Sequence, residues 1–264
     1  RFLQAYGSSN LIDWCSPEAH EAYPAVWAMQ GLKRAVGYDL AQTRYVLSFG
    51  SQWLDQHWSP AQAAETFAAL RGGRQAVRPK FVHIEPRLSL TAAKADEWIP
   101  IRPGTEGALA LGLAHVLLRE GLYDREFVEY LTHGFEDPGG GDGERIGFRR
   151  LVLRDYSPAT VASITGIEVG TIFRLAREFA AQKPALAIGF DGSGVASQRC
   201  YDRMAIHALN ALVGSIDVPG GLTHFQDVNL LSQPVSEPDA LAERGLAMPR
   251  IDRTDPAVYA LGDA

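Results

Sequence analysis

The sequence predicts an α/β protein made of two lobes, each containing a mainly parallel β-sheet flanked by helices. Three short apolar segments, residues 45–49, 81–84 and 185–188, have the length and composition of buried strands. Turns and segments with helical periodicity separate them, and this alternation is typical of parallel sheets covered on both faces. The composition agrees, because 46% of the 264 residues are apolar and 21% are charged, as in ordinary globular proteins.

Helices are expected between the strands, and local signals indicate where they begin. Ser16 can cap a first helix over residues 17–36, although Pro24 can interrupt it. Ser157 and the proline after it can begin another helix. The other segments with apolar residues at helical spacing are residues 60–70, 107–120, 168–181 and 197–213.

A change in composition predicts how the chain is divided. Four glycines between positions 137 and 143 indicate a flexible loop between the lobes. The predicted parts are a first lobe over 1–135, a Gly-rich linker over 136–155, part of a second lobe over 156–222 and an irregular tail over 223–264. Because the chain begins with Arg1 and shows no targeting segment, we expect it to be an internal piece of a longer protein.

Charge, cysteine content and hydropathy exclude several classes of protein. A net charge of -6 argues against a protein that binds nucleic acid by neutralising phosphates. The two cysteines, Cys15 and Cys200, cannot form a disulfide scaffold and cannot alone hold a structural zinc or an iron–sulfur cluster. No apolar run reaches the roughly 18 residues that a membrane span needs.

The loops that follow the three predicted strands have features of a nucleotide-binding edge. In α/β sheets ligands bind where strands end, and glycines there let backbone N–H groups approach phosphates. A carboxylate such as Asp55 or Glu85 can accept two hydrogen bonds from the N1–H and exocyclic amine of a guanine. Each loop alone is also compatible with an ordinary strand-to-helix turn. A dinucleotide-binding Rossmann motif is disfavoured, because Ser197 stands where the third glycine of that motif should be.

One long block is much more specific than any single loop. Residues 84–109 contain Glu85 followed by Pro-Arg, then an Ala-Asp-Glu-Trp segment, and finally Pro-Gly-Thr followed by Glu106. This order resembles the molybdopterin oxidoreductases of the dimethyl sulfoxide reductase superfamily, and among them the polysulfide- and thiosulfate-reductase-like catalytic subunits. The resemblance continues to residues 209–221 and covers about residues 1–222.

The resemblance implies a bis(molybdopterin guanine dinucleotide) cofactor with molybdenum or tungsten, each dinucleotide bound by one lobe. Three of the matching positions carry a side chain one methylene longer than is usual in the family, with the functional group retained: Gln52, Glu85 and Glu106. The residues expected to contact the cofactor are Asn10, Gly50, Ser51, Gln52, Asp55, Glu85, Arg87, Gly104, Thr105, Glu106, Gly192 and Gly194.

The side chain that would bond the metal is left open by the sequence. In the family this ligand follows an Asn-containing turn such as residues 7–10, and alignment without gaps places it at Glu18. A small shift places Cys15 there instead, and a third alternative is that no side chain of this chain binds the metal. Cys15 and Glu18 are therefore the candidate catalytic and metal-binding residues.

Two classes of function follow from the resemblance. The first is an enzyme that performs two-electron oxygen-atom or sulfur-compound redox chemistry on a small molecule. A 4Fe-4S cluster would lie only in a missing N-terminal part. The expected partners of the enzyme are an iron–sulfur electron-transfer subunit and a membrane anchor subunit, and its expected location is periplasmic or membrane-associated. The second is a metal-free scaffold subunit of a membrane-associated electron-transfer complex that keeps this fold.

Overall fold

The computed structural model describes residues 2–10, 25–32, 36–56, 60–71, 78–137, 146–189, 196–224, 238–249 and 251. The chain divides into two units: Arg1–His20 with Gln226–Ala264, and Glu21–Phe225. The sheet and most of the predicted cofactor contacts belong to the larger unit, Glu21–Phe225.

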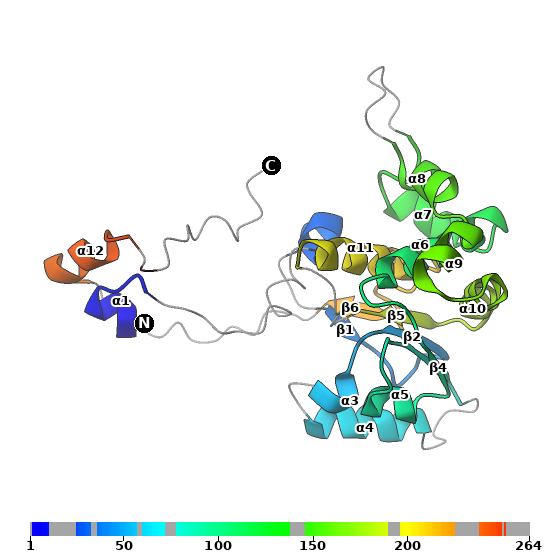
Figure 1. Ribbon diagram of the computed structural model, residues 1–264, viewed down its shortest axis with the longest axis horizontal. Helices are drawn as coiled ribbons and strands as arrows, with labels where there is room; N and C mark the ends of the chain where they lie inside the picture. The colour runs from blue at the N-terminus through cyan, green and yellow to red at the C-terminus, as the bar shows by residue number, and fades with distance from the viewer. Residues whose placement is uncertain are drawn as a thin grey trace. The chain divides into compact units, whose positions relative to one another are not determined.

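Four parallel strands form the sheet at the centre of the larger unit (Figure 1). The strand order is β4-β3-β2-β5, so β2 has a parallel neighbour on each side. This arrangement confirms the three predicted strands and their parallel pairing, and it adds the short strand β4, which the sequence did not predict. The strands are β2 (Tyr45–Phe49), β3 (Lys80–Ile84), β4 (Glu97–Ile99) and β5 (Ala185–Ile188).

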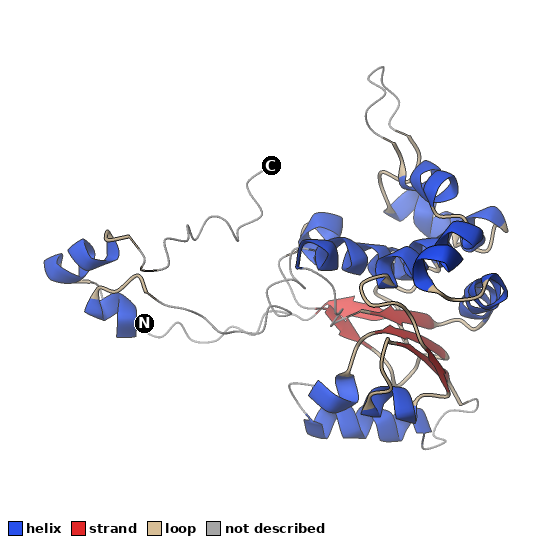
Figure 2. Ribbon diagram, viewed as in Figure 1, coloured by secondary structure: helices blue, strands red, loops and turns tan. Residues whose placement is uncertain are grey.

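Helices cover both faces of this sheet (Figure 2). The first face packs against α3 (Trp53–Gln56), α4 (Pro60–Arg71) and α5 (Leu90–Lys94). The second face packs against α6 (Glu106–Arg119), α10 (Val169–Ala181) and α11 (Ala196–Leu212). Beyond this layer lie α7 (Arg125–Leu131), α8 (Phe148–Asp155) and α9 (Pro158–Thr165).

The side chains of β2 alternate between the two helical layers. Tyr45, Leu47 and Phe49 lie in a cluster with apolar residues of α6, α10 and α11. Val46 lies in a second cluster with Phe81 and residues of α4. Because both faces are covered, all five residues of β2 are buried, and the strand reads as a continuous apolar run interrupted by one serine.

Local capping signals set the ends of α9 as the sequence predicted. The Ser157 hydroxyl accepts a hydrogen bond from the Thr160 N–H at 3.2 Å, and Pro158 occupies the first turn. Gly166 ends the helix with a φ of +80°, a conformation that glycine adopts without strain.

The predicted first helix is wrong at its C-terminal end. Residues 25–30 are helical, Gly31 follows with a φ of +69°, and β1 (Val36–Tyr38) lies where the helix was expected to finish. β1 pairs antiparallel with β6 (Leu222–His224), far away along the chain, in the register Tyr38↔Leu222. A three-residue pairing over such a separation leaves no periodic signal in the sequence.

The predicted division into two lobes is also corrected. β5 was expected to belong to a second lobe, yet it pairs with β2 from Tyr45↔Ala185 to Ser48↔Ile188. One sheet therefore combines strands from both sides of the predicted linker. The predicted irregular tail contains α12 (Ala240–Leu246), whose first turn is capped by the Asp239 carboxylate.

The smaller unit contains two short helices, α1 (Phe2–Tyr6) and α12. Gly7 lies so close to α12 that a Cβ atom there would overlap the Ala242 backbone. The Ser9 hydroxyl donates to the Met248 carbonyl at 3.0 Å, and the Asn10 Oδ1 accepts from the Ile251 N–H at 2.8 Å. These contacts join the two segments that make up the smaller unit.

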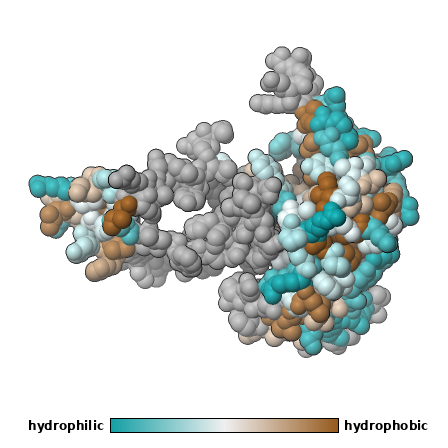
Figure 3. Space-filling view, viewed as in Figure 1, coloured by the Kyte–Doolittle hydropathy of each residue, from teal (hydrophilic) through white to brown (hydrophobic). Residues whose placement is uncertain are grey.

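The described surface carries some large apolar side chains. Leu88, Leu90 and Tyr130 are exposed, and Figure 3 shows polar and apolar residues interspersed over the visible face of the larger unit. None of the described helices is by itself long and apolar enough to cross a membrane. α9 and α10 pass that test only as a pair, and they bend by 112° between them.

Asn210 completes the hydrogen bonding of the edge strand β5. Its side-chain Oδ1 accepts from the Ala187 N–H at 2.8 Å, and its Nδ2 donates to the Ala187 carbonyl at 2.9 Å. Asn210 is fully buried, so its amide takes the place that a further strand would occupy.

We expect Asn210→Leu to destabilise the protein by about 2–4 kcal/mol, because it leaves a buried N–H and a buried carbonyl unpaired. Urea unfolding measures this change. Gln182→Ala, which also removes a side-chain amide but at the partly exposed end of α10, should change the free energy of unfolding by less than about 0.5 kcal/mol. Equal effects of the two substitutions would contradict this role for Asn210.

Candidate functional site

Parallel pairing in register brings two of the predicted loops to one edge of the sheet. Phe49 at the end of β2 is paired with Ile84 at the end of β3, so the chain leaves both strands at the same level. The Gly50 N–H donates to the Ile84 carbonyl at 2.8 Å and joins the two loops directly. We call this edge, formed by residues 50–52, 85–87 and 104–107, the rim. The predicted neighbourhood of the Gly50 and Glu85 loops is therefore confirmed.

Glu85 lies at the centre of the rim and is buried. Its Oε1 accepts from the Gln52 Nε2 at 2.5 Å and lies 3.5 Å from the Arg87 Nε. The Arg87 guanidinium in turn donates to the Gln52 Oε1 at 2.6 Å. The three side chains thus form a closed polar triangle in which Glu85 is inside and Arg87 is 64% exposed.

Two residues that the sequence analysis did not single out support Glu85 from below. The His83 Nε2 lies 3.1 Å from the Glu85 Oε2, and the His83 Nδ1 lies 3.0 Å from the Ser48 hydroxyl. His83 and Ser48 are fully buried within β3 and β2, where they are paired in the strand register. A polar residue at each of two paired positions in apolar strands was the sequence signal that could have revealed them.

Ser48, His83 and Glu85 are the residue types of a hydrolytic triad, but their burial excludes that chemistry. A nucleophilic serine must meet its substrate, whereas the Ser48 side chain lies under the sheet's covering helices with no exposed surface. The arrangement therefore orients Glu85 and does not perform nucleophilic attack.

Glu106 is the second buried acid of the rim and differs from Glu85 in having no partner among the described residues. It begins α6 and is only 2% exposed, and neither of its carboxylate oxygens forms a hydrogen bond of good geometry with the described residues, although the backbone N–H groups of residues 104–106 lie near them. Burial raises the pKa of Glu106 and the charge of Glu85 adds to the rise, while the backbone N–H groups of residues 104–106 act in the opposite direction. A buried acid without a side-chain partner lowers the stability of the protein, so stability does not explain why Glu106 is buried here.

The turn before Glu106 is held firmly. Gly104 has a φ of +73°, and the Thr105 hydroxyl donates to the Arg102 carbonyl at 2.7 Å. The Arg102 guanidinium donates to the carbonyls of Ser163 and Ile164 at the end of α9. These contacts position the start of α6 and, with it, the Glu106 carboxyl.

Asp202 on α11 adds a third acid near the start of α6. A Cβ atom on Gly107 would overlap the Asp202 Oδ1, so glycine is required at this approach. Burial raises the pKa of Asp202 to about 6, the charge of Glu106 adds to the rise, and the hydrogen bond from the Gly107 N–H opposes it. No local sequence signal indicates this residue, because it lies on a helix far away along the chain.

Ser51 is the second unsatisfied polar group of the rim. Ser51 is buried, and its hydroxyl oxygen has no hydrogen-bond partner among the described residues. The preceding Gly50 has a φ of +63°, which an L-residue adopts only with strain. The Gly50 turn therefore presents a hydroxyl, and the Glu106 turn a carboxyl, that the described protein does not use.

The other predicted site residues fall outside this description or outside the larger unit. Cys15, Glu18, Gly192 and Gly194 lie outside the described residues, as does the side chain of Asp55. Asn10 belongs to the smaller unit, where its side chain bonds to Ile251.

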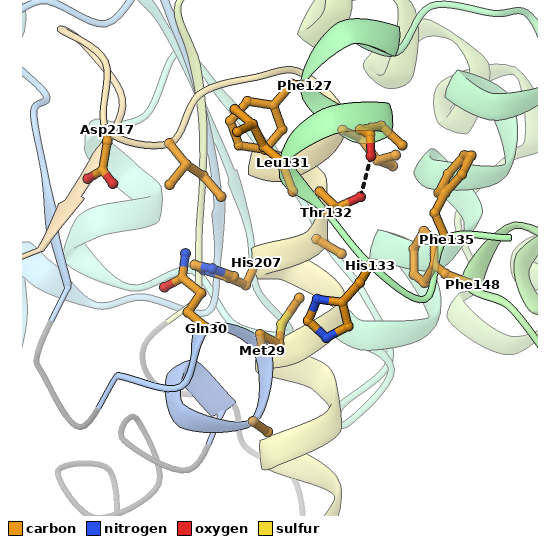
Figure 4. Close-up of a pocket in the computed structure, with 16 residues that line it drawn as sticks. Met29, Gln30, Phe127, Leu131, Thr132, His133, Phe135, Phe148, His207 and Asp217 are labelled. Carbon is orange, nitrogen blue, oxygen red and sulfur yellow. Dashed lines mark hydrogen bonds between the residues drawn. The ribbon is translucent and has the colours of Figure 1, made fainter. Parts of the chain in front are cut away.

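A separate cavity of about 510 Å³ lies at the other end of α11 (Figure 4). His207 points from α11 toward Gln30, and burial together with the nearby His224 lowers the pKa of His207 to about 4. His207 lies about three turns after the start of α11, which corresponds to about 16 Å along a helix. The wall is mostly apolar, and a highly charged nucleotide fits the polar rim better than this cavity.

The rim as a whole can bind a purine nucleotide. An unpaired carboxyl can accept from two adjacent N–H groups of a base, and an exposed guanidinium together with backbone N–H groups can bind phosphate. The unused Ser51 hydroxyl and Glu106 carboxyl fit such a ligand, because it would supply the partners that they lack.

Comparison with known proteins identifies the family of the chain. The family profile described as molybdopterin oxidoreductase matches residues 1–259. The arsenate respiratory reductase molybdopterin-containing subunit of Chrysiogenes arsenatis is 33% identical over 94% of this chain. The menaquinone reductase molybdopterin-binding-like subunit of Nitratidesulfovibrio vulgaris is 33% identical over 84%. The chain spans about 30% of the length of these curated relatives.

A solved structure supports the fold. Acetylene hydratase from Pelobacter acetylenicus superimposes with a TM-score of 0.61 and 30% sequence identity. The match covers 84% of this chain and 28% of the acetylene hydratase chain.

We expect Asp202→Asn to stabilise the protein at pH 8 and to have little effect near pH 4. Between 3.8 and about 6 the folded state binds more protons than the unfolded state, so the stability contributed by Asp202 falls as pH rises through that window. Asparagine can still accept the Gly107 hydrogen bond without burying a charge. After discounting for the partial exposure of Asp202, the gain at pH 8 is about 1 kcal/mol, measured by urea unfolding.

Asp155→Asn provides the matched control for this measurement. Asp155 is exposed, and its hydrogen bonds from Arg154 lower its pKa, so no gain is expected at pH 8. A gain for Asp202→Asn that is the same at both pH values would contradict the assigned protonation.

Proposed function

Because the chain belongs to the molybdopterin oxidoreductase family, whose members bind a molybdopterin cofactor, we propose that it is part of a catalytic subunit. The proposed cofactor is bis(molybdopterin guanine dinucleotide) with molybdenum or tungsten. The proposed reaction is a two-electron oxygen-atom or sulfur-compound transformation of a small molecule. The similarity to a subunit named arsenate respiratory reductase supports a reductase.

The unpaired carboxyl of Glu106 is the observation that carries the nucleotide proposal. Glu85 already uses both of its oxygens, on Gln52 and on His83. Among the described residues no side chain pairs with Glu106, only nearby backbone N–H groups of residues 104–106 act on it, and a fixed turn holds it at the rim. We therefore assign guanine recognition to Glu106 and a supporting role to Glu85.

The other rim residues would hold the phosphates and the ribose. Arg87 is exposed and carries a positive charge beside the Gly50 turn, where backbone N–H groups and the Ser51 hydroxyl add donors. Gly50 permits the close backbone approach that a phosphate needs. We extend the same role to Gly192 and Gly194 on the basis of the sequence pattern alone.

When bound, the metal of the cofactor supplies the two-electron redox chemistry, and this chain's contribution to the metal would be one anionic side chain. Cys15 is the first candidate because a thiolate is a strong donor to a highly charged metal, and Glu18 is the second. The rim residues bind and orient the dinucleotide and keep its base away from water.

A metal-free scaffold subunit is the second candidate function. One relative is named a molybdopterin-binding-like subunit of menaquinone reductase, and the three lengthened side chains at Gln52, Glu85 and Glu106 depart from the usual family pattern. In either case the proposed partners are an iron–sulfur electron-transfer subunit and a membrane anchor subunit, at a periplasmic or membrane-associated location.

We expect Glu106→Gln in the full-length protein to lower its guanine nucleotide content at least about tenfold, measured as guanine released by acid per polypeptide. A glutamine presents one amide N–H group toward the base, where two acceptors are needed, and the mismatch is worth about 1.5–3 kcal/mol. The protein should remain folded, since the substitution removes a buried acid.

Glu120→Gln, at the C-terminal end of the same helix, is the control, because Glu120 pairs with Arg177 away from the rim. It should leave the guanine content unchanged. Full guanine content in Glu106→Gln would contradict the assignment of this residue to guanine recognition.

The metal ligand is tested by Cys15→Ala in the full-length protein. If Cys15 binds the metal, the variant should lose molybdenum- or tungsten-dependent turnover at least about a thousandfold while its unfolding transition stays within about 1 kcal/mol of the wild type. Unchanged turnover would transfer the role to Glu18, tested by Glu18→Gln. Absence of metal from the wild-type protein would favour the scaffold function.

A further inference from the structure

We propose that His83 and Ser48 are positioning residues that hold Glu85 in one orientation, so that Glu85 and Gln52 fix the Arg87 guanidinium for a phosphate group of the bound nucleotide. The inference rests on the proposed function, since it assigns a phosphate to Arg87. It extends the proposed nucleotide site by two buried residues that do not touch the ligand.

The chain of contacts is continuous from the sheet interior to the surface. It runs from the Ser48 hydroxyl to the His83 Nδ1 at 3.0 Å, and from the His83 Nε2 to the Glu85 Oε2 at 3.1 Å. It continues from the Glu85 Oε1 to the Gln52 Nε2 at 2.5 Å, and from the Gln52 Oε1 to the Arg87 guanidinium at 2.6 Å. Each side chain therefore has its orientation set by the previous one.

The proton positions follow from the acceptors. The Glu85 carboxylate can only accept, so the His83 Nε2 must carry a proton. In a neutral ring the Ser48 hydroxyl directs its proton to the His83 Nδ1, and in a charged ring it accepts from Nδ1 and can donate to the Ser51 carbonyl at 3.5 Å. Both cases leave the Glu85 Oε2 engaged and direct the Oε1 toward Gln52.

The Glu85 backbone is fixed as well as its side chain. The Trp98 indole N–H from β4 donates to the Glu85 carbonyl at 3.0 Å, and the Glu85 N–H donates to the Ile99 carbonyl at 3.2 Å. With the backbone held, the rotamer of the side chain is the remaining freedom, and His83 removes it. Without His83, the side-chain torsions of Glu85 would have to be ordered on binding.

Arg87 needs this support because it is the exposed end of the chain of contacts. Its side chain is 64% exposed, and a long cation at a surface loses rotamer freedom when it binds. The contacts with Gln52 and Glu85 use one edge of the guanidinium, while the remaining N–H groups can donate to a phosphate in a bidentate manner. The buried residues thereby preorganise a surface cation.

The test compares GDP binding by cofactor-free full-length variants, measured by isothermal titration calorimetry. Arg87→Ala should raise the Kd about tenfold, as expected for one charge-assisted contact with phosphate. His83→Leu should raise it to a similar extent, although the side chain at this buried position does not touch the ligand. The double variant should bind no more weakly than Arg87→Ala alone, since His83 acts only through Arg87.

Two further variants separate positioning from a general loss of stability. His83→Gln, whose amide can donate to Glu85 and accept from Ser48, should stay within about threefold of the wild-type Kd. His115→Leu removes another buried histidine, whose Nδ1 lies 3.2 Å from the Val152 carbonyl away from the rim, and should leave the Kd unchanged. GMP and inorganic phosphate serve as second probes that distinguish a nucleotide phosphate from a free phosphate site.

The outcomes distinguish this inference from the proposed function. A wild-type protein that does not bind GDP overturns both. Normal GDP binding by His83→Leu, or additive losses in the double variant, overturns the positioning role alone. If His83→Leu does not fold, Ser48→Ala carries the same test and should raise the Kd about threefold, because it releases the His83 ring.

Discussion

The in-register pairing of β2 with β3 is the interaction on which the rim depends. It ends both strands at the same level, and the Gly50 N–H bonded to the Ile84 carbonyl continues the pairing into the loops. Gln52 can reach Glu85 only because these loops leave the sheet side by side. A slip of one residue would turn Ser48 and His83 toward opposite faces and break the support beneath Glu85.

The rim contains two buried acids with opposite electrostatic situations. Glu85 is satisfied on every side by a histidine, an amide and a guanidinium. Glu106 is equally buried, no described side chain pairs with it, and burial raises its pKa. Proteins keep such a group where a ligand supplies the missing hydrogen bonds. Asp202 beside it also has a raised pKa, so burying its charge lowers the stability of the protein further. The apolar packing of α6, α10 and α11 on the sheet offsets this loss of stability.

Much of the larger unit could be predicted from sequence because its signals are local. Apolar runs predicted β2, β3 and β5, and helical periodicity with caps predicted α4, α6, α10 and α11 to within about two residues. The single sheet could not be predicted, because whether β5 joins β2 depends on a pairing across the glycine-rich segment. The same holds for β1 with β6, for Asn210 at the edge of β5, and for Asp202 beside Gly107. In the site, the rim loops followed from strand order, whereas the support from His83 and Ser48 follows from side-chain geometry that no spacing rule contains.

An experimental structure of the full-length protein with its native cofactor bound tests the assignment of guanine recognition to Glu106 most directly. We expect a guanine whose N1–H and exocyclic amine lie within hydrogen-bonding distance of the Glu106 carboxyl, with a phosphate beside Arg87 and the Gly50 turn. A cofactor-loaded structure in which Glu106 pairs with protein groups alone, and the guanine lies away from the ends of β2 and β3, would contradict it.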